Sequence, residues 1–305
     1  MAKPPATNTL LIVNHADWPA HGPDLELPHL NRALQTRWTQ ARTPSASDDL
    51  LCAAERAQAQ ALGWQLAPGT PTPWGAWHAE QAGLDKSADW ALISPCHWDI
   101  NMTGVRMDDP AQLRLDAQHS QALMAALAPL ALEDGIQLHW HSPTVWLARG
   151  EVFRHLVSPS AARMADIELS EHLPHIHQDP AATRLLRRLQ NEAQMLFYDH
   201  PVHDARAAER QAAVNSIWFH GAGPWVSPSK PPRPYKTIDL YALSPDLREA
   251  WLLADAWLGD QLKAQPAADI LMCQSSTTRL SSQQPLAWWR RWQMQRAKQW
   301  RDALP

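Results

Sequence analysis

A short polar segment directly after the first predicted strand contains side chains whose types and position could do chemistry. Residues 9–13 form an apolar run that predicts a buried strand, and Asn14, His15 and Asp17 follow it. Sheets of α/β proteins place their ligands at the carboxyl ends of strands, so these three residues are candidates for ligand binding. Polar residues at such positions also cap loops, and that structural role is the alternative.

Histidines form a second group of candidates, because the imidazole ring binds Zn²⁺ and Mn²⁺. His139 and His141 alternate along a predicted strand and so face the same side, while His172, His175 and His177 lie within six residues. Their spacing matches no standard zinc motif, and the chain contains 15 histidines. The sequence therefore predicts surface or hydrogen-bonded histidines, with no bound metal and no cofactor.

The stretch from residue 180 onward predicts an amphipathic helix with a basic face. Asp179 and Pro180 are a start signal, because the Asp side chain caps orphan N–H groups and Pro fits the first turn. Pro201 ends the helix, because it has no N–H to donate. The basic groups could clamp a phosphate or carboxylate, and a solvated helix face is the alternative. The candidates for ligand binding in this stretch are Arg184, Arg187, Arg188, Glu192, His200, His203 and Arg206.

Asn215 is a polar residue inside an apolar run, residues 214–219, that predicts a short strand. A buried amide must find hydrogen-bond partners. Asn215 is therefore either a structural residue or part of the ligand site.

Composition narrows the class of protein. The 305 residues are 45% hydrophobic and 19% charged, which is typical of a soluble globular protein. The net charge of −4 argues against nucleic acid as a partner, and the first apolar run is too short for a signal peptide or a membrane span. Cys52, Cys96 and Cys273 are widely spaced, which favours reduced thiols and a cytoplasmic location. The 17 tryptophans are expected to fill the core, with a stacking surface for a sugar or base as the alternative.

Strand and helix patterns alternate along the chain. This order predicts an α/β fold, with a mainly parallel sheet flanked by helices and some antiparallel additions, among them a hairpin of the strands 136–140 and 144–147. We expect one α/β domain over residues 1–305, with two lobes joined by the proline-rich connector 223–234 as the alternative. The predicted strands are 9–13, 90–93, 136–140, 144–147, 214–219, 237–243 and 269–273, and the predicted helices are 47–62, 74–81, 116–132, a helix from 180, 244–264 and 285–304.

The segment HPVHDARAAERQAAVNSIWFHGAG, residues 200–223, resembles part of the archaeal-type cofactor-independent phosphoglycerate mutases. Those enzymes carry a similar HPvN-x-x-R … AN … RG-x-G pattern. Over most of the chain, including SPCHW, LRRLQNEAQMLFYDHPVHDAR and VNSIWFHGAG, the sequence is similar to a bacterial family described as phosphoglycerate mutase-like or RpfE-type regulatory proteins. The matching positions in the mutase pattern are His200, Pro201, Val202, His203, Arg206, Asn215, Gly221 and Gly223.

These resemblances imply an alkaline-phosphatase-like α/β core and add His97 and His220 to the candidates for ligand binding. The sequence nevertheless departs from the active mutases, which use two metal ions and a Ser nucleophile. The first strand ends in Asn14 and His15 where the family has Asp-Gly, and His220 replaces an Arg. Two-metal phosphoryl transfer needs a cage rich in carboxylates, so these departures predict that mutase catalysis is lost.

We therefore expect a cytoplasmic binding or regulatory protein that recognises a phosphorylated or anionic ligand, or a protein partner. No catalytic residue is assigned, and neither nucleic acid nor a membrane span is expected. The alternative is an active metal-dependent phosphoglycerate mutase or phosphatase with a divergent site.

Overall fold

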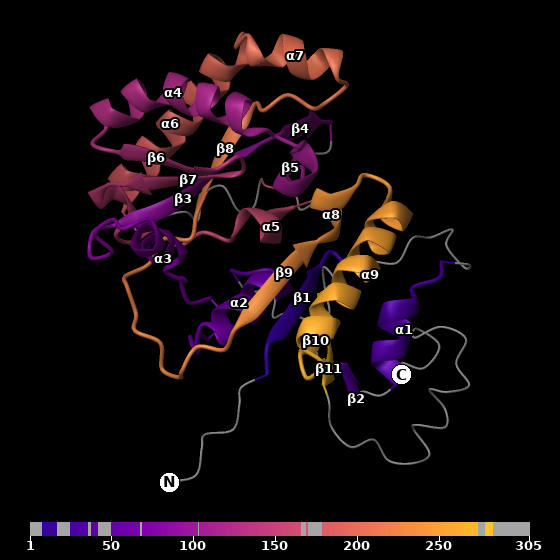
Figure 1. Cartoon of the computed structure of the whole chain (residues 1–305). Helices are drawn as coiled ribbons and strands as arrows, with labels where there is room; N and C mark the ends of the chain where they lie inside the picture. Colours follow the sequence, from indigo (N-terminus) through magenta and orange to yellow (C-terminus); the bar gives the residue numbers. More distant parts are fainter. Residues whose placement is uncertain are drawn as a thin grey trace. The chain divides into compact units, whose positions relative to one another are not determined.

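The chain divides into two compact units, which are described separately (Figure 1). Unit 1 comprises Met1–Ser47, Cys52–Gln65 and Pro228–Pro305, and unit 2 comprises Asp48–Leu51 and Leu66–Ser227. The expectation of one domain, or of two lobes joined at 223–234, stays a prediction. This computed structural model describes residues 8–16, 25–35, 38–41, 50–67, 69–102, 104–165, 169, 179–273 and 278–282.

Unit 1 contains a five-stranded mixed sheet with a parallel centre. The strand order is β2-β11-β10-β1-β9, in which β1 pairs in parallel with both β10 and β9. The two remaining pairings, β10 with β11 and β11 with β2, are antiparallel. The strands are β1 (Leu10–Asn14), β2 (Trp38–Ala41), β9 (Tyr235–Asp239), β10 (Asp269–Cys273) and β11 (Thr278–Ser282).

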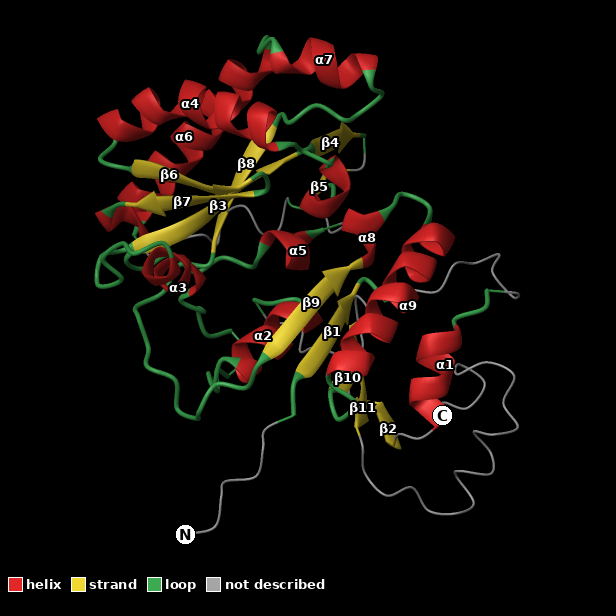
Figure 2. Ribbon diagram, viewed as in Figure 1, coloured by secondary structure: helices red, strands yellow, loops and turns green. Residues whose placement is uncertain are grey.

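Helices cover both faces of this sheet (Figure 2). Successive side chains of a strand point to opposite faces, so β1 contributes to two cores. Leu11 and Val13 pack in one cluster with Trp251 of α9 (Leu247–Ala264). Leu10 and Ile12 pack in the other with the alanines of α2 (Ala53–Ala61). Burial on both faces explains why β1 is apolar at every position before Asn14.

The first helix of unit 1, α1 (Pro28–Gln35), is capped by another helix. Asp255 of α9 accepts hydrogen bonds from the main-chain N–H groups of His29, at 3.2 Å, and Leu30, at 2.7 Å. These are orphan donors at the start of a helix, and burial would otherwise leave them unpaired. Gly259 allows the close approach, because a Cβ there would lie 2.7 Å from the His29 ring.

Unit 2 contains a four-stranded sheet that is antiparallel throughout, with the order β6-β7-β3-β8. The strands are β3 (Trp90–Cys96), β6 (Gln137–Ser142), β7 (Val145–Arg149) and β8 (Ser216–His220). The expectation of a mainly parallel sheet therefore holds only for three strands of unit 1. The predicted hairpin is confirmed as β6 and β7, which a tight turn can join only as antiparallel strands. The antiparallel pairing of β3 with β7 and β8 was not predicted, because it joins segments far apart in the chain.

Helices α4 (Ala117–Glu133) and α6 (Pro180–Tyr198) pack against this sheet and share a buried core with Trp146, Phe153 and Phe219. Helix α3 (Trp74–Gln81) contacts β3 and β7. The smaller elements of unit 2 are the hairpin β4 (Trp98–Asn101) and β5 (Gly104–Met107), the short helices η1 (Pro110–Leu113) and η2 (Glu151–Phe153), α5 (Ala161–Met164) and α7 (Val202–Ala208).

Several predicted elements need correction. A further helix, α7, follows Pro201 and was not predicted. The strand predicted at 237–243 ends at Asp239, and α8 (Leu240–Leu243) begins directly after it. Helix α2 begins at Ala53, with Cys52 as its N-cap. The predicted helix 285–304 lies outside the described residues. No helix in the described part of the chain is long and apolar enough to cross a membrane.

Candidate functional site

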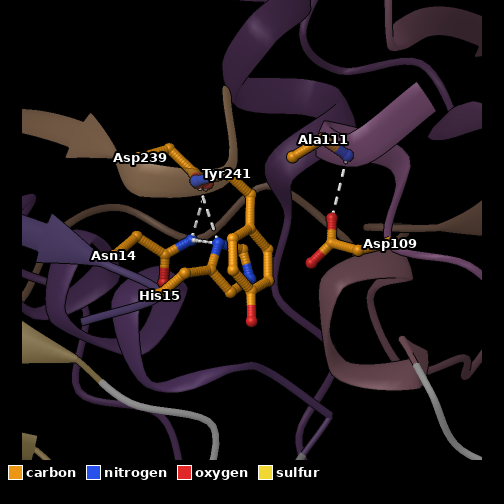
Figure 3. A network of polar contacts seen from close by, with 6 residues as sticks. All are labelled: Asn14, His15, Asp109, Ala111, Asp239 and Tyr241. Atoms are coloured by element: carbon orange, nitrogen blue, oxygen red, sulfur yellow. Dashed lines mark hydrogen bonds and ion pairs between the residues drawn. The ribbon is translucent and has the colours of Figure 1, made fainter. Parts of the chain in front are cut away.

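The carboxyl ends of β1 and β9 bring together a polar cluster in unit 1 (Figure 3). The two strands are parallel and pair with Asn14 opposite Asp239. Parallel strands end at the same edge of a sheet, so the side chains that follow them meet there. The cluster consists of Asn14, His15, Asp239 and Tyr241.

The Asp239 carboxylate is the centre of this cluster. Its Oδ2 accepts a hydrogen bond from Asn14 Nδ2 at 2.9 Å, and its Oδ1 lies 2.8 Å from His15 Nδ1. The same Oδ1 accepts a hydrogen bond from the main-chain N–H of Tyr241 at 3.0 Å, which caps α8. Both carboxylate oxygens are therefore engaged by donors of unit 1.

Electrostatics favours an ionised Asp239. Burial raises the pKa of its carboxyl, but the hydrogen bonds from His15, Asn14 and the Tyr241 N–H together hold that pKa below its ordinary value. A carboxylate can only accept, so His15 Nδ1 carries the proton of their shared hydrogen bond. This fixes Nε2 as the nitrogen through which His15 meets any further partner, as acceptor when neutral and as donor when protonated.

His15 is held in a fixed orientation. Its ring stacks on that of Tyr241, with centroids 4.2 Å apart and planes 12° from parallel. Its backbone has φ of 51°, in the left-handed region that non-glycine residues seldom adopt. The next residue, Ala16, donates its N–H to the Cys273 carbonyl at 2.9 Å, which anchors the turn. Residues held in such conformations are concentrated at binding and active sites.

The structure brings two predicted candidates, Asn14 and His15, into one site, and adds two residues that the sequence did not indicate. Asp239 was missed because the predicted strand continued to residue 243. An Asp at the end of a parallel strand and directly before a helix is a signal that could have identified it. Asp17 lies outside the described residues. Asp109, also drawn in Figure 3, belongs to unit 2 and accepts the Ala111 N–H at 2.8 Å to cap η1.

Arg206 lies apart from the exposed arginines of the predicted anion clamp. Its side chain is fully buried in unit 2, where Nε donates to the Ala212 carbonyl at 2.9 Å and Nη2 to the Leu113 carbonyl at 2.7 Å. Burial lowers the pKa of its guanidinium. Main-chain carbonyls thus engage Nε and Nη2, whereas Nη1 is buried and has no hydrogen-bond partner among the described residues.

The other arginines of the proposed clamp are exposed on α6, on the side away from its buried residues. Arg188 forms ion pairs with Asp134 of α4 and, at 3.7 Å, with Glu192. Arg184 lies one turn before Arg188 and Arg187 directly precedes it, and both are exposed. The anion clamp at these arginines, and the solvated helix face as its alternative, stay predictions.

Two histidines flank the start of α7. His200 Nδ1 accepts the main-chain N–H of Val202 at 3.3 Å, and its ring centroid lies 6.5 Å from that of His203. Burial first, and then the charges of His200 and Arg206, lower the pKa of His203.

Asn215 and His97 have structural roles. The Asn215 side chain pairs with the main chain of Trp98, accepting its N–H at 2.7 Å and donating to its carbonyl at 2.9 Å. This amide therefore fixes the start of β4 as a neighbouring strand would. His97 Nδ1 lies 2.7 Å from the Ala213 carbonyl and donates to it.

His220 belongs to a histidine cluster inside unit 2. Its Nε2 lies 3.0 Å from Ser94 Oγ, and both side chains are buried. Burial, and then the charge of His78, lower the pKa of His220 to about 3. His78 packs edge-on against His141, with ring centroids 4.5 Å apart, and burial followed by the charge of His141 lowers its pKa to about 4. His220 and His78 are therefore neutral at pH 7 and have little strength as bases.

Among the described residues, no group of three or more His, Cys, Asp or Glu side chains could hold a metal ion. His139 packs near the Trp90 ring, with centroids 5.5 Å apart, whereas His172, His175 and His177 lie outside the described part of the chain.

Comparison with known proteins gives distant likenesses. No protein-family model matches the chain, and no curated protein matches it. A cofactor-independent phosphoglycerate mutase from Thermoplasma acidophilum DSM 1728 is 13% identical, with a TM-score of 0.37, covering 92% of this chain and 91% of that one. The PH0037 protein from Pyrococcus horikoshii is 11% identical, with a TM-score of 0.43, covering 91% and 87%. The chain thus has a distant structural similarity to a cofactor-independent phosphoglycerate mutase.

Proposed function

We propose that this chain is a phosphoglycerate mutase-like protein without mutase catalysis, and that it binds a phosphorylated or anionic ligand. The proposal places the ligand at Asn14 and His15, on an alkaline-phosphatase-like core, in a cytoplasmic regulatory protein of the RpfE type. The observation that carries it is the engagement of the Asp239 carboxylate by Asn14, His15 and the Tyr241 N–H.

The described residues at this edge do not fit the two metal ions of the active mutases. Metal cages for phosphoryl transfer need several carboxylates. Here an amide and an imidazole follow β1, and both oxygens of the one carboxylate accept hydrogen bonds from unit 1. We therefore derive no catalytic step through metal ions.

His15 is the residue through which we propose that this edge recognises an anion, because its Nδ1 and the Asn14 amide are already engaged by Asp239. Asp239 orients His15 through Nδ1, so that protonation of the ring places an N–H donor at Nε2. Hydrogen bonds from a charged donor to a phosphate oxygen are among the stronger ones in proteins. Stacking on Tyr241 limits rotation of the ring, which lowers the entropy lost when a ligand binds.

The test combines binding and turnover of 3-phosphoglycerate with the full chain. Saturation at 100 times the dissociation constant should stabilise the protein by about 2.7 kcal/mol, measured as a raised melting temperature. His15→Ala should remove most of this shift, whereas His155→Ala, at an exposed histidine of unit 2, should leave it unchanged. Formation of 2-phosphoglycerate with added Mn²⁺ would show that the protein is a mutase, and an undiminished shift in His15→Ala would show that the ligand binds elsewhere.

One observation favours a second candidate, an active phosphatase or mutase with a divergent site. An ionised Asp bonded to His Nδ1 is the arrangement that orients a general base in many hydrolases. This candidate predicts hydrolysis of p-nitrophenyl phosphate by the full chain, and a loss of at least roughly 100-fold in Asp239→Asn. Turnover that is equal in the parent and in Asp239→Asn would exclude a catalytic dyad.

A further inference from the structure

The His15 ring bonds to a carboxylate through one nitrogen and is partly exposed. Its Nδ1 lies 2.8 Å from Asp239 Oδ1, and 13% of the His15 side chain and 26% of the Asp239 side chain are exposed. Water and small ions therefore reach this pair. His15 can exchange a proton with solvent while it stays bonded to Asp239.

The neighbours of His15 fix where the neutral ring carries its proton (Figure 3). Asn14 Nδ2 lies 3.2 Å from His15 Nδ1 and 2.9 Å from Asp239 Oδ2. The amide nitrogen and the Nδ1–H group are both donors, so they do not bond to each other, and Asn14 donates to the carboxylate. The neutral ring thus has its proton on Nδ1 and a lone pair on Nε2.

A bound anion and the neutral His15 ring do not fit together. An oxygen of a phosphate or sulfate carries lone pairs and negative charge, so it is repelled by the lone pair of Nε2. The neutral ring can move its proton to Nε2 only by giving up the hydrogen bond from Nδ1 to the ionised Asp239. The protonated ring has donors at both nitrogens, so it can bond to Asp239 and to an anion at the same time.

We propose that this site binds an anion only together with a proton, which His15 takes up, so that the anion is released as the pH rises. The inference rests on the proposed ligand site at His15 and adds how that site is regulated. Histidine suits this role because its charge changes between about pH 5 and pH 8. The coupling is reciprocal, because a bound anion must also favour protonation of the ring.

Neighbouring strands and a short helix supply the titratable groups closest to the ring. Asp239, at the end of β9, is the carboxylate that pairs with His15, and its negative charge favours the protonated ring. Tyr241 of α8 stacks on the ring. On β10, burial raises the pKa of the Cys273 thiol to about 12, so this group stays uncharged at neutral pH.

Helices α2 and α9, which pack on the two faces of β1, supply further charged groups. Their cations are Arg56, Arg248 and Lys263. Their carboxylates and the donors bonded to them are Glu55 with the Cys52 N–H at 2.9 Å, Glu249 with Ser244 Oγ at 2.7 Å, Asp255 with the Leu30 N–H at 2.7 Å and Asp260 with Lys263 Nζ at 3.0 Å. These carboxylates have donors elsewhere, whereas Asp239 pairs with His15 directly.

Sulfate is the probe for the full chain, because its charge is constant between about pH 5 and pH 9, whereas phosphate groups titrate in this range. Calorimetric titration at pH 6, 7 and 8, in two buffers of different ionisation enthalpy, measures both the affinity and the protons taken up. At pH 8 the uptake should approach about one proton per sulfate. The affinity should then fall by up to about tenfold per pH unit.

Three variants assign the proton. His15→Gln should remove the proton uptake, because an amide keeps the same donor at every pH. Asp239→Asn keeps an acceptor for the Tyr241 N–H but loses the charge, so sulfate binding should be lost at a pH about one unit lower. His155→Gln, at an exposed histidine of unit 2, is the matched control and should bind sulfate as the parent chain does. Circular dichroism of every variant checks folding.

The possible failures separate this inference from the proposed function. Sulfate that binds equally well at pH 6 and pH 8, without proton uptake, would overturn the inference and leave the ligand site standing. Unchanged proton uptake in His15→Gln would assign the proton to another group and would also overturn it. If only 3-phosphoglycerate binds, the same criteria apply after subtraction of the protons that its own phosphate takes up. If neither probe binds at any of these pH values, the inference and the proposed function are both wrong.

Discussion

His15 is held by contacts on three sides. Nδ1 bonds to Asp239, the ring stacks on Tyr241, and the following N–H bonds to the Cys273 carbonyl. A residue in a sparsely populated backbone region costs about 1–3 kcal/mol, and it persists only when its surroundings determine it. These three contacts hold His15 in its left-handed backbone conformation. This supports a functional role for the carboxyl edge of β1.

At the same scale, the buried His220 should make stability depend on pH. Its pKa is about 3 in the folded chain, compared with about 6.5 when unfolded. The unfolded chain therefore binds the proton first, so stability is full above pH 6.5 and falls as the pH drops toward 3. Between pH 7 and pH 5 this one group should cost about 2 kcal/mol of the free energy of unfolding.

Urea unfolding at the two pH values measures this effect. In His220→Gln the loss between pH 7 and pH 5 should shrink by about 2 kcal/mol, because the titrating group is gone. His155→Gln, at an exposed histidine, should reproduce the loss seen in the parent. An unchanged loss in His220→Gln would mean that other groups carry the acid sensitivity.

At the scale of helices and strands, the sequence predicts helix starts but not which distant strands pair. Asp179 and Asp116 cap the helices that the sequence predicts, because a cap depends only on neighbouring residues. The hairpin of β6 and β7 was predicted because a short turn joins its strands, whereas the antiparallel pairing of β3 with β7 and β8 joins segments far apart and was missed. The burial of Arg206 was missed for the same reason, since its partner Leu113 lies 93 residues away. For Asn215 the sequence predicts that a buried amide needs partners, but it does not identify Trp98, which lies 117 residues away.

Asp255 gives a prediction for how α1 is attached. Asp255→Ala removes the acceptor for two buried main-chain N–H groups, so it should destabilise the chain by about 1–3 kcal/mol. Asp260→Ala on the same helix should change stability by less than about 0.5 kcal/mol, because its side chain is 73% exposed. Equal effects of the two substitutions on the urea midpoint would contradict capping by Asp255.

At the scale of the molecule, each unit has its own core. Trp251 is fully buried in a cluster of unit 1, and Leu189 is fully buried in a cluster of unit 2. Unit 1 is built from three segments of the chain, including both of its ends, whereas residues 66–227 supply nearly all of unit 2. Because each core lies within one unit, one unit can unfold while the other stays folded. We therefore propose that the chain forms two lobes.

Scanning calorimetry of the full chain tests this proposal. Leu189→Ala should cost about 2–5 kcal/mol and Trp251→Ala about 3–5 kcal/mol, as expected for large buried side chains. If the units unfold separately, Leu189→Ala lowers one transition and Trp251→Ala lowers another, because each substitution weakens a different core. A single transition that both substitutions lower would instead support one cooperative domain. Ligand stabilisation gives an independent check, because 3-phosphoglycerate bound at His15 should raise only the transition that Trp251→Ala lowers.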